Sequence, residues 1–124
     1  MKQFLACLAL SLCSWSCAAA PHAEAELMLV EFPVDAEKRA EFIEELHLIL
    51  VDTRAFEGCL EATVWTNESE PDKVWIYEEW ESRDHQAAYL QWRTDTGNTA
   101  HLGPYLTGDL RFLWLNQHEL DSAE

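Results

Sequence analysis

The sequence predicts a single α+β domain in which strands and helices alternate, preceded by a short leader. Two segments, 36–54 and 83–94, carry apolar residues at helical spacing. Short segments rich in β-branched and aromatic residues precede, separate and follow them, with Gly, Pro and Asp at the joints. After the leader about a hundred residues remain, which is enough for one small domain and its core.

The N-terminal segment 1–20 has the features of a secretory signal peptide. A basic start at Lys2 is followed by an apolar run from Phe4 to Cys13 and then by small residues. The run is too short to span a bilayer as a mature helix. We therefore expect export to the periplasm or the medium, with cleavage near residue 20 and no later than residue 23. Lipid attachment at Cys17 is the alternative, and only then do we expect the domain to be held at a membrane.

The first strand and helix follow the leader directly. Glu26–Val34 is rich in apolar residues and is ended by proline, which predicts a strand. Asp35 is a good N-cap for the next segment. The helix over 36–54 has an apolar stripe formed by Ala36, Ala40, Ile43, Leu46, Ile49, Leu50 and Thr53. Gly58 closes the connection, where the exit from a helix favours a residue that tolerates positive φ.

The next two strands are expected to form a hairpin. Cys59–Asn67 and Lys73–Trp80 both have strand composition, and the turn between them contains Pro71 and Asp72. Two strands joined by so short a turn pair in antiparallel fashion.

The second helix and the last strand complete the domain. Ser82 caps a helix that runs to about Thr94, and Gly97 ends it. Residues 98–108 are irregular with a short helical turn, and Asp109–Leu115 is the last strand. The resulting order, β-α-β-β-α-β, is the ferredoxin-like arrangement, with a four-stranded antiparallel sheet and both helices on one face. The domain covers 24–118, and 119–124 is an acidic tail.

Apolar side chains occupy both faces of the predicted sheet. In the strand 73–80, Val74, Ile76 and Trp80 point to one side and Trp75 to the other, as does Trp65 in the preceding strand. The two helices cover one face only. Each large apolar side chain gains about 1.5–3 kcal/mol from burial, so an uncovered second face would be a large apolar patch. We therefore expect a homodimer in which two sheets pack face to face.

The composition limits the classes of partner. Acidic residues outnumber basic ones by 23 to 8, which gives a formal net charge of −15. Nucleic acid would be repelled by this charge. In the predicted domain no two His or Cys residues stand three or four positions apart, and there is no glycine-rich phosphate loop. A small molecule remains as the expected partner, and no metal site is expected.

Several segments resemble the antibiotic biosynthesis monooxygenase family. They are TRAFEGCL at 53–60, the strand ending in EEW, and WES followed by a helix containing AYLQWRTDTG. The resemblance extends over Leu27–Leu115 and implies a ferredoxin-like domain that pairs into a dimeric α/β barrel. It also implies oxidation of an aromatic phenol or quinol with molecular oxygen, in a family whose members often use no flavin, haem or metal. We therefore expect no cofactor.

The family's marker positions are retained in part. Trp80 matches the tryptophan that closes the third strand in the best-described oxygenases of the family. Ile76 stands where those enzymes have asparagine, and Gln86 stands where they have tyrosine. Tyr89 stands where many other members have histidine.

The second predicted helix carries the candidate site. Its apolar stripe, with Arg93 at the edge, is formed by His85, Ala88, Tyr89, Trp92 and Thr96. His85 is the expected proton acceptor, because its ordinary pKa is near neutrality, and Tyr89 the expected donor to a substrate oxygen. The residues expected to bind a small apolar aromatic substrate are Ile76, Trp80, Gln86, Trp92 and Arg93. Ordinary packing of this helix on the sheet is the alternative interpretation.

The sequence is therefore compatible with two functions. The first is a cofactor-independent monooxygenase that oxidises a small phenol or quinol with oxygen. The second is a non-catalytic exported domain, ligand-binding or stress-associated, that keeps the fold without the chemistry. The replacements at Ile76 and Gln86 favour the second.

Overall fold

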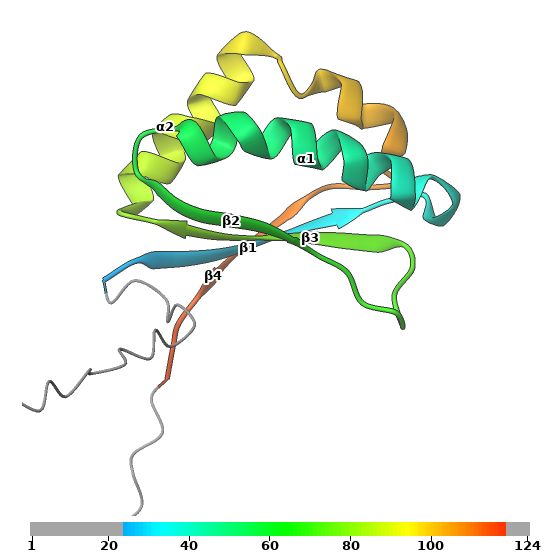
Figure 1. Cartoon of the computed structure of the whole chain (residues 1–124), viewed down its shortest axis with the longest axis horizontal. Coiled ribbons are helices and arrows are strands. Elements are labelled where there is room, and N and C mark those ends of the chain that lie inside the picture. Colours follow the sequence, from blue (N-terminus) through cyan, green and yellow to red (C-terminus); the bar gives the residue numbers. More distant parts are fainter. Residues whose placement is uncertain (1–23, 119–124) are drawn as a thin grey trace, which may run out of the picture.

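The computed structural model describes residues 24–118, so the predicted leader and the acidic tail lie outside the described residues. Figure 1 shows a sheet with two helices above it. The elements are β1 (Glu26–Pro33), the 3-10 helix η1 (Ala36–Lys38), α1 (Arg39–Ala55), β2 (Cys59–Trp65), β3 (Lys73–Trp80), α2 (Arg83–Thr96), the 3-10 helix η2 (Ala100–Tyr105) and β4 (Arg111–Leu115).

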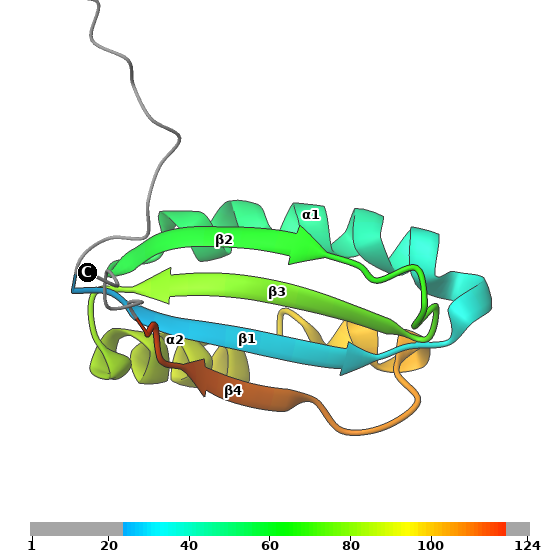
Figure 2. The same ribbon diagram turned by 90° about the horizontal axis from the view of Figure 1, so that it is seen from below.

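The order of elements confirms the predicted ferredoxin-like fold. The strands form one four-stranded sheet in the order β2-β3-β1-β4. All three neighbouring pairs are antiparallel. Both helices lie on one face, and the opposite face, called the open face below, carries no helix of residues 24–118 (Figure 2). No helix within residues 24–118 combines the length and the apolar character needed to cross a membrane.

The core lies between the helices and the sheet. Alternate residues of β1, Met28, Val30 and Phe32, are buried against α1, as the two-residue period of a strand requires. Phe42 and Leu46 of α1 fill the space above them. Phe42 lies outside the stripe predicted for this helix, although it is completely buried. Each such side chain contributes about 1.5–3 kcal/mol by leaving water.

The predicted helix boundaries hold to within a few residues, and their caps are formed as expected. The side chain of Asp35 accepts a hydrogen bond from the backbone N–H of Glu37 at 3.0 Å, so the predicted helix begins as the 3-10 turn η1 before α1 continues it. Ser82 accepts from the backbone N–H of His85 at 3.2 Å. Gly97 ends α2 with φ 61°, a conformation in which glycine is favoured.

Two features of the structure require a glycine at position 58: its backbone conformation and the close approach of a neighbouring side chain. Its φ is +87°, in the left-handed region. A Cβ at this position would also overlap the side chain of His85. The loop between α1 and β2 therefore passes directly under the first turn of α2.

The inward face of α2 differs from the predicted stripe. Gln86, Tyr89 and Arg93 are buried, whereas Ala88 and Thr96 are exposed. The physical reason is that hydrogen bonds and cavity contacts, described below, hold polar side chains inside. The buried face of α2 is therefore rotated about the helix axis relative to the face predicted from apolar residues.

Candidate functional site

A cavity of about 120 Å³ lies between the two helices and the sheet. Most of its wall is apolar, and this part is formed by Val30, Phe32, Leu46, Ile49, Ile76, Leu90, Leu102, Leu110 and Phe112. Its polar wall is formed by Glu78, Gln86, Tyr89, Arg93 and Thr99. Apolar walls with a few polar groups are typical of small-molecule sites.

The size of the cavity limits the ligand. Cavities of about 150 Å³ hold a benzene ring, whereas drug-sized ligands occupy about 300 Å³ or more. A single aromatic ring therefore matches the observed space. Phe112 is the most exposed lining residue, at 44 %, so the cavity meets the surface beside the edge strand β4.

The cavity includes four of the residues predicted for the site and leaves out three. Ile76, Gln86, Tyr89 and Arg93 line it. The other three, His85, Trp80 and Trp92, are not among the lining residues. Their roles in function stay predictions, but the structure gives each of the three a clear packing environment.

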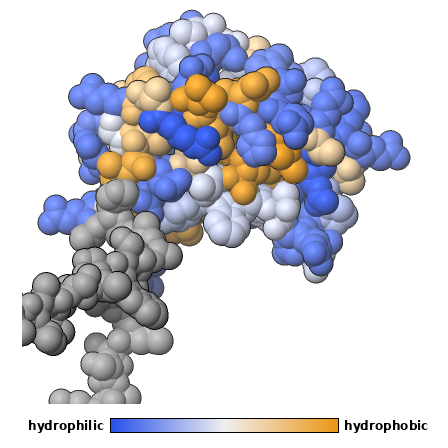
Figure 3. Space-filling view, in the orientation of Figure 1, coloured by the Kyte–Doolittle hydropathy of each residue, from blue (hydrophilic) through white to orange (hydrophobic). Residues whose placement is uncertain are grey.

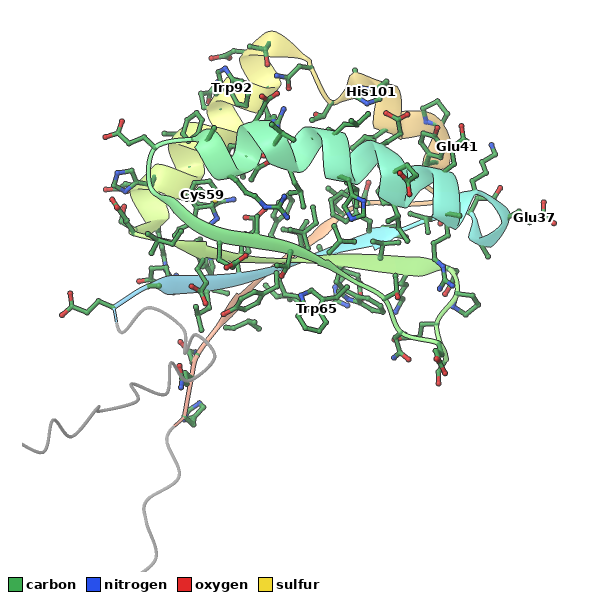
Figure 4. All side chains as sticks on the ribbon, in the orientation of Figure 1. Glu37, Glu41, Cys59, Trp65, Trp92 and His101 are labelled. Carbon is green, nitrogen blue, oxygen red and sulfur yellow. The ribbon has the colours of Figure 1, made fainter. Side chains whose placement is uncertain are left out.

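Trp80 and Trp92 belong to an aromatic cluster beside the cavity. Trp80 is completely buried, with its ring centroid 5.2 Å from that of Tyr89 and 6.5 Å from that of Phe56. Trp92 packs on Phe56 at 5.5 Å between centroids, and the guanidinium of Arg93 lies 4.6 Å from its ring. Figure 4 shows Trp92 on α2, on the helical side of the sheet. This cluster fixes α2 against the end of α1.

His85 lies at the start of α2, away from the cavity wall. Its Nδ1 and the Ser82 hydroxyl are 2.7 Å apart, and its Nε2 lies 3.8 Å from a carboxylate oxygen of Glu81. Its side chain is one-third exposed. In this position it covers Gly58 and supports the helix cap.

Arg93 is the centre of a buried hydrogen-bond network. Its Nε donates to the Tyr89 hydroxyl at 2.9 Å, and its Nη2 donates to the carbonyl of Ile49 at 2.9 Å and to Thr53 Oγ1 at 3.1 Å. Its Nη1 donates to Asn98 Oδ1 at 2.9 Å. Among the described residues no carboxylate forms an ion pair with it. The network joins α1 to α2.

The same network includes the hydroxyl of Tyr89. Its oxygen accepts from Arg93 Nε at 2.9 Å and lies 2.8 Å from Thr53 Oγ1, a contact that either hydroxyl can donate. Burial raises the pKa of Tyr89, although its hydrogen bonds with Thr53 and Arg93 act in the opposite direction. Tyr89 is therefore a neutral phenol whose hydroxyl is already engaged by two protein groups.

Glu78 is the polar residue of the cavity that lies on the sheet. It follows Ile76 and precedes Trp80 on the helical face of β3, and it is only 3 % exposed. Its Oε2 accepts a hydrogen bond from the Trp80 indole N–H at 2.8 Å. Burial raises the pKa of the Glu78 carboxyl, although the Trp80 hydrogen bond and the charge of Arg93 act in the opposite direction. The strand period of two was the signal that could have placed it in the site.

Gln86 faces the cavity with its amide uncommitted. It is 5 % exposed, and no side-chain hydrogen bond joins it to another residue of the described segment. An amide offers two N–H donors and a carbonyl acceptor. Gln86 and Glu78, with the hydroxyl of Thr99, are thus the cavity residues with polar side-chain atoms to spare for a ligand.

The geometry of residues 24–118 favours neither a metal site nor a reactive thiol. No group of three or more His, Cys, Asp or Glu side chains is placed to hold a metal ion there. Burial, with the charge of Glu78, raises the pKa of Cys59 to about 11. The thiol is thus protonated at neutral pH, and a protonated thiol is a poor nucleophile.

Fold and cavity together define the class of this protein: a small ferredoxin-like α+β domain with a ligand-sized cavity on the helical side of its sheet. The family model of antibiotic biosynthesis monooxygenases matches residues 27–96, more than half of the chain. The chain therefore belongs to the antibiotic biosynthesis monooxygenase family. No curated protein matches the sequence.

Solved structures with the same fold agree with this assignment. A conserved protein from Methanosarcina mazei Go1 has a TM-score of 0.66 at 18 % identity, covering 76 % of this chain and 93 % of its own. An antibiotic biosynthesis monooxygenase has a TM-score of 0.65 at 13 % identity, covering 76 % and 99 %. The ActVA-Orf6 monooxygenase of Streptomyces coelicolor, solved with nanaomycin D, has a TM-score of 0.64 at 19 % identity, covering 81 % and 93 %. At these identities the likeness establishes the fold.

Proposed function

We propose that this protein is a cofactor-independent monooxygenase that oxidises a small phenol or quinol with molecular oxygen in the cavity below α2. The observation that carries the proposal is a mostly apolar cavity with uncommitted polar atoms on Glu78 and Gln86, in a chain of this family. The volume of about 120 Å³ favours a substrate with one aromatic ring.

The substrate itself supplies the electrons for this reaction, and the protein supplies proton transfer and oxyanion stabilisation. An electron-rich ring that has lost its hydroxyl proton transfers electrons to oxygen readily. For a single-ring quinol, one oxygen atom enters the ring, the other leaves as water, and the product is a hydroxyquinone. The substrate supplies all four electrons, so no separate reductant is required. In this proposal Gln86, which lines the cavity, donates its amide N–H to the negative oxygen that develops, as in oxyanion stabilisation.

Oxygen uptake tests this function directly. Wild-type protein is supplied with single-ring quinols and, for comparison, three-ring anthrones, with mass spectrometry of the products. We expect uptake above the rate without protein for single-ring substrates, and a loss of about 100-fold in kcat for Gln86→Leu, because an oxyanion donor is removed. His85→Ala is measured beside it to test the predicted proton transfer by this histidine. Uptake equal to the rate without protein for every compound would exclude the function for these substrates.

A non-catalytic ligand-binding domain is the second candidate. Two observations favour it: Ile76 and Gln86 replace family marker residues, and the hydroxyl of Tyr89 is committed to Arg93 and Thr53. Native mass spectrometry of the purified protein separates the two functions. A small aromatic that is retained and recovered unchanged under oxygen supports binding alone.

We also propose that two copies pair through the open face. Side chains that alternate with the core residues point to this face, among them Trp65, Trp75, Tyr77, Leu113 and Leu115. Trp65 is 59 % exposed and Leu115 38 %, and Figure 4 shows Trp65 on the side of the sheet away from the helices. One end of the face is polar, since Glu31 contacts Lys73 at 3.6 Å and Arg111 at 3.1 Å. Leu29, Tyr77 and Leu113 cross the middle of this face, and charged residues lie toward both ends of the strands. A face that combines apolar and charged contacts is common in protein interfaces.

Export completes the proposal. It rests on the basic start, apolar run and small residues of segment 1–20. Cell fractionation of the full chain is expected to recover the protein outside the cytoplasm. Cys17→Ala distinguishes the two forms of export, because it releases a lipid-anchored protein from the membrane fraction and leaves a cleaved one unaffected.

A further inference from the structure

The two oxygens of the Glu78 carboxyl have different surroundings. Oε2 accepts the hydrogen bond from the Trp80 indole N–H at 2.8 Å. Oε1 accepts no hydrogen bond from any residue of the described chain. Within residues 24–118 the only fully enclosed side-chain polar atom without a partner is Nη1 of Arg39. Oε1 is therefore not sealed in the core, and the space it reaches is the cavity that Glu78 lines.

The Trp80 hydrogen bond also fixes the direction of this carboxyl. Trp80 is completely buried and held between Phe56 and Tyr89, so its N–H cannot turn to another acceptor. With Oε2 held there, the remaining oxygen is directed away from Trp80. A carboxylate held in this way is a preorganised acceptor on the sheet side of the cavity, where the other lining residues are apolar.

We propose that Glu78 is the proton acceptor of this cavity, taking the hydroxyl hydrogen of a single-ring phenol on Oε1. The proton moves from the phenol oxygen to the carboxylate, which leaves a phenolate and a neutral carboxylic acid. The inference rests on the proposed function for its substrate, and it assigns proton transfer to a residue of β3 where the sequence had suggested His85. In the structure His85 is bound to Ser82 outside the cavity wall.

The charged and titratable groups around Glu78 are consistent with this role. Arg93 and Tyr89 face it from α2, and Cys59 is near it on β2. Tyr89 and Cys59 are neutral at physiological pH, because burial raises the pKa of both. Burial likewise raises the pKa of Glu78, more than Arg93 and Trp80 lower it. A base is most effective when its pKa lies near the working pH.

Equilibrium binding of two probes tests the acceptor without any turnover. Phenol and benzene have the same ring, and only phenol donates a hydrogen bond. The test variant is Glu78→Gln, in which the amide oxygen keeps the Trp80 hydrogen bond and an N–H₂ donor faces the cavity. The matched control is Glu79→Gln, the same change at a buried position on the open face of the same strand.

We expect wild type to bind phenol about 10- to 100-fold more tightly than benzene, the value of a hydrogen bond to a charged acceptor. Glu78→Gln is expected to reduce this preference, since only the weaker bond from the amide N–H₂ to the phenol oxygen replaces the bond to the carboxylate. The variant is also expected to bind benzaldehyde, a pure acceptor, more tightly than wild type does. Glu79→Gln and His85→Gln are expected to keep the preference for phenol. Equal preference for phenol in wild type and a folded Glu78→Gln would overturn the proposal.

A pH titration of wild type provides a second readout that does not depend on any variant. The affinity for phenol is expected to fall as pH is lowered, because the protonated carboxyl is a weaker acceptor, while benzene affinity stays constant. Parallel curves for the two probes would contradict the role of Glu78. Phenol preference without oxygen uptake would leave this site intact and remove only the oxygenase, whereas uptake with no phenol preference would require a different base.

Discussion

Arg93 shows how a charged side chain becomes part of a core. Its guanidinium spans the gap between the helices, donating to Tyr89, Thr53 and the carbonyl of Ile49, and it is only 7 % exposed. A buried charge is tolerated when its hydrogen-bonding groups are satisfied. The network therefore stabilises the packing of α2 on α1 and at the same time keeps one wall of the cavity in place.

Replacement of this arginine should measure the strength of the network. Arg93→Met keeps the length of the side chain but removes the buried hydrogen bonds that the guanidinium donates to Tyr89, Thr53 and the carbonyl of Ile49. The free energy of unfolding is expected to fall by about 2–4 kcal/mol, measured by urea denaturation. Arg83→Met is the control, since Arg83 is exposed and its 3.2 Å ion pair with Glu26 contributes about 0–1 kcal/mol. Similar losses in the two variants would contradict a structural role for the network.

The buried carboxyl of Glu78 makes stability depend on pH in a defined direction. Because its pKa is raised in the folded state, its contribution is fully present below the ordinary carboxyl pKa and is lost as pH rises through the folded pKa. Glu78→Gln carries no such penalty. We expect the variant and wild type to unfold at the same urea concentration near pH 4, and the variant to be the more stable above it. A difference that is independent of pH would show that the pKa of the Glu78 carboxyl does not change on folding.

At the scale of elements, α2 is the part that positions the site. It presents Gln86, Tyr89 and Arg93 to the cavity, and its first turn is held by Ser82, whose Oγ accepts from the backbone of His85 and contacts its ring. Loss of such a cap weakens the first helical turn. The first turn is also where Gln86 lies, so stability and ligand contact are linked there.

Two substitutions of Ser82 test the N-cap of α2, one that removes the capping acceptor and one that retains an acceptor. Ser82→Ala is expected to lower the free energy of unfolding by about 1 kcal/mol. Ser82→Asp retains an acceptor at the N-cap and adds a favourable charge at the helix N-terminus, so it is expected to recover most of this loss. Thermal unfolding followed by circular dichroism measures both. Equal destabilisation by Ala and Asp would indicate that the hydroxyl acts only through the His85 ring.

The sequence predicted elements better than it predicted the site, and the reason is physical. Strand alternation in β3 and caps such as Asp35 and Ser82 are local signals, and they placed the elements within a few residues. The rotation of α2 depends on tertiary hydrogen bonds that bury Gln86 and Arg93, and hydropathy counts such residues as exposed. Glu78 was overlooked for the same reason.

At the scale of the whole molecule, large apolar side chains remain exposed on the open face and on α1, besides Phe112 at the cavity. On the open face Trp65 and Leu115 are exposed. On α1, Leu48 and Val51 are 68 % and 63 % exposed, and Figure 3 shows apolar side chains gathered in the middle of the side that α1 presents. The two surfaces point in different directions, so a change on one is a control for the other.

The net charge of −15 bears on how two copies meet. Like-charged copies repel each other, and salt screens this repulsion over about 10 Å at 0.1 M. A dimer held by apolar contact through the open face should therefore become tighter as salt is raised. An assembly held mainly by ion pairs between copies would become weaker instead.

Sedimentation equilibrium can decide which surface, if either, is covered. Wild type is expected to be a dimer whose dissociation constant falls with added salt. Trp65→Glu places a carboxylate on the open face, at the end of the edge strand β2 beside Trp75. Pairing through this face would bury the carboxylate without a partner, so we expect a monomer or a dimer weakened at least about 100-fold. Leu48→Glu adds the same charge on α1, and it is expected to leave the dimer unchanged apart from a small repulsion. If Leu48→Glu dissociates the dimer and Trp65→Glu does not, the pairing surface is α1, and the open face must remain in contact with water in spite of its tryptophans.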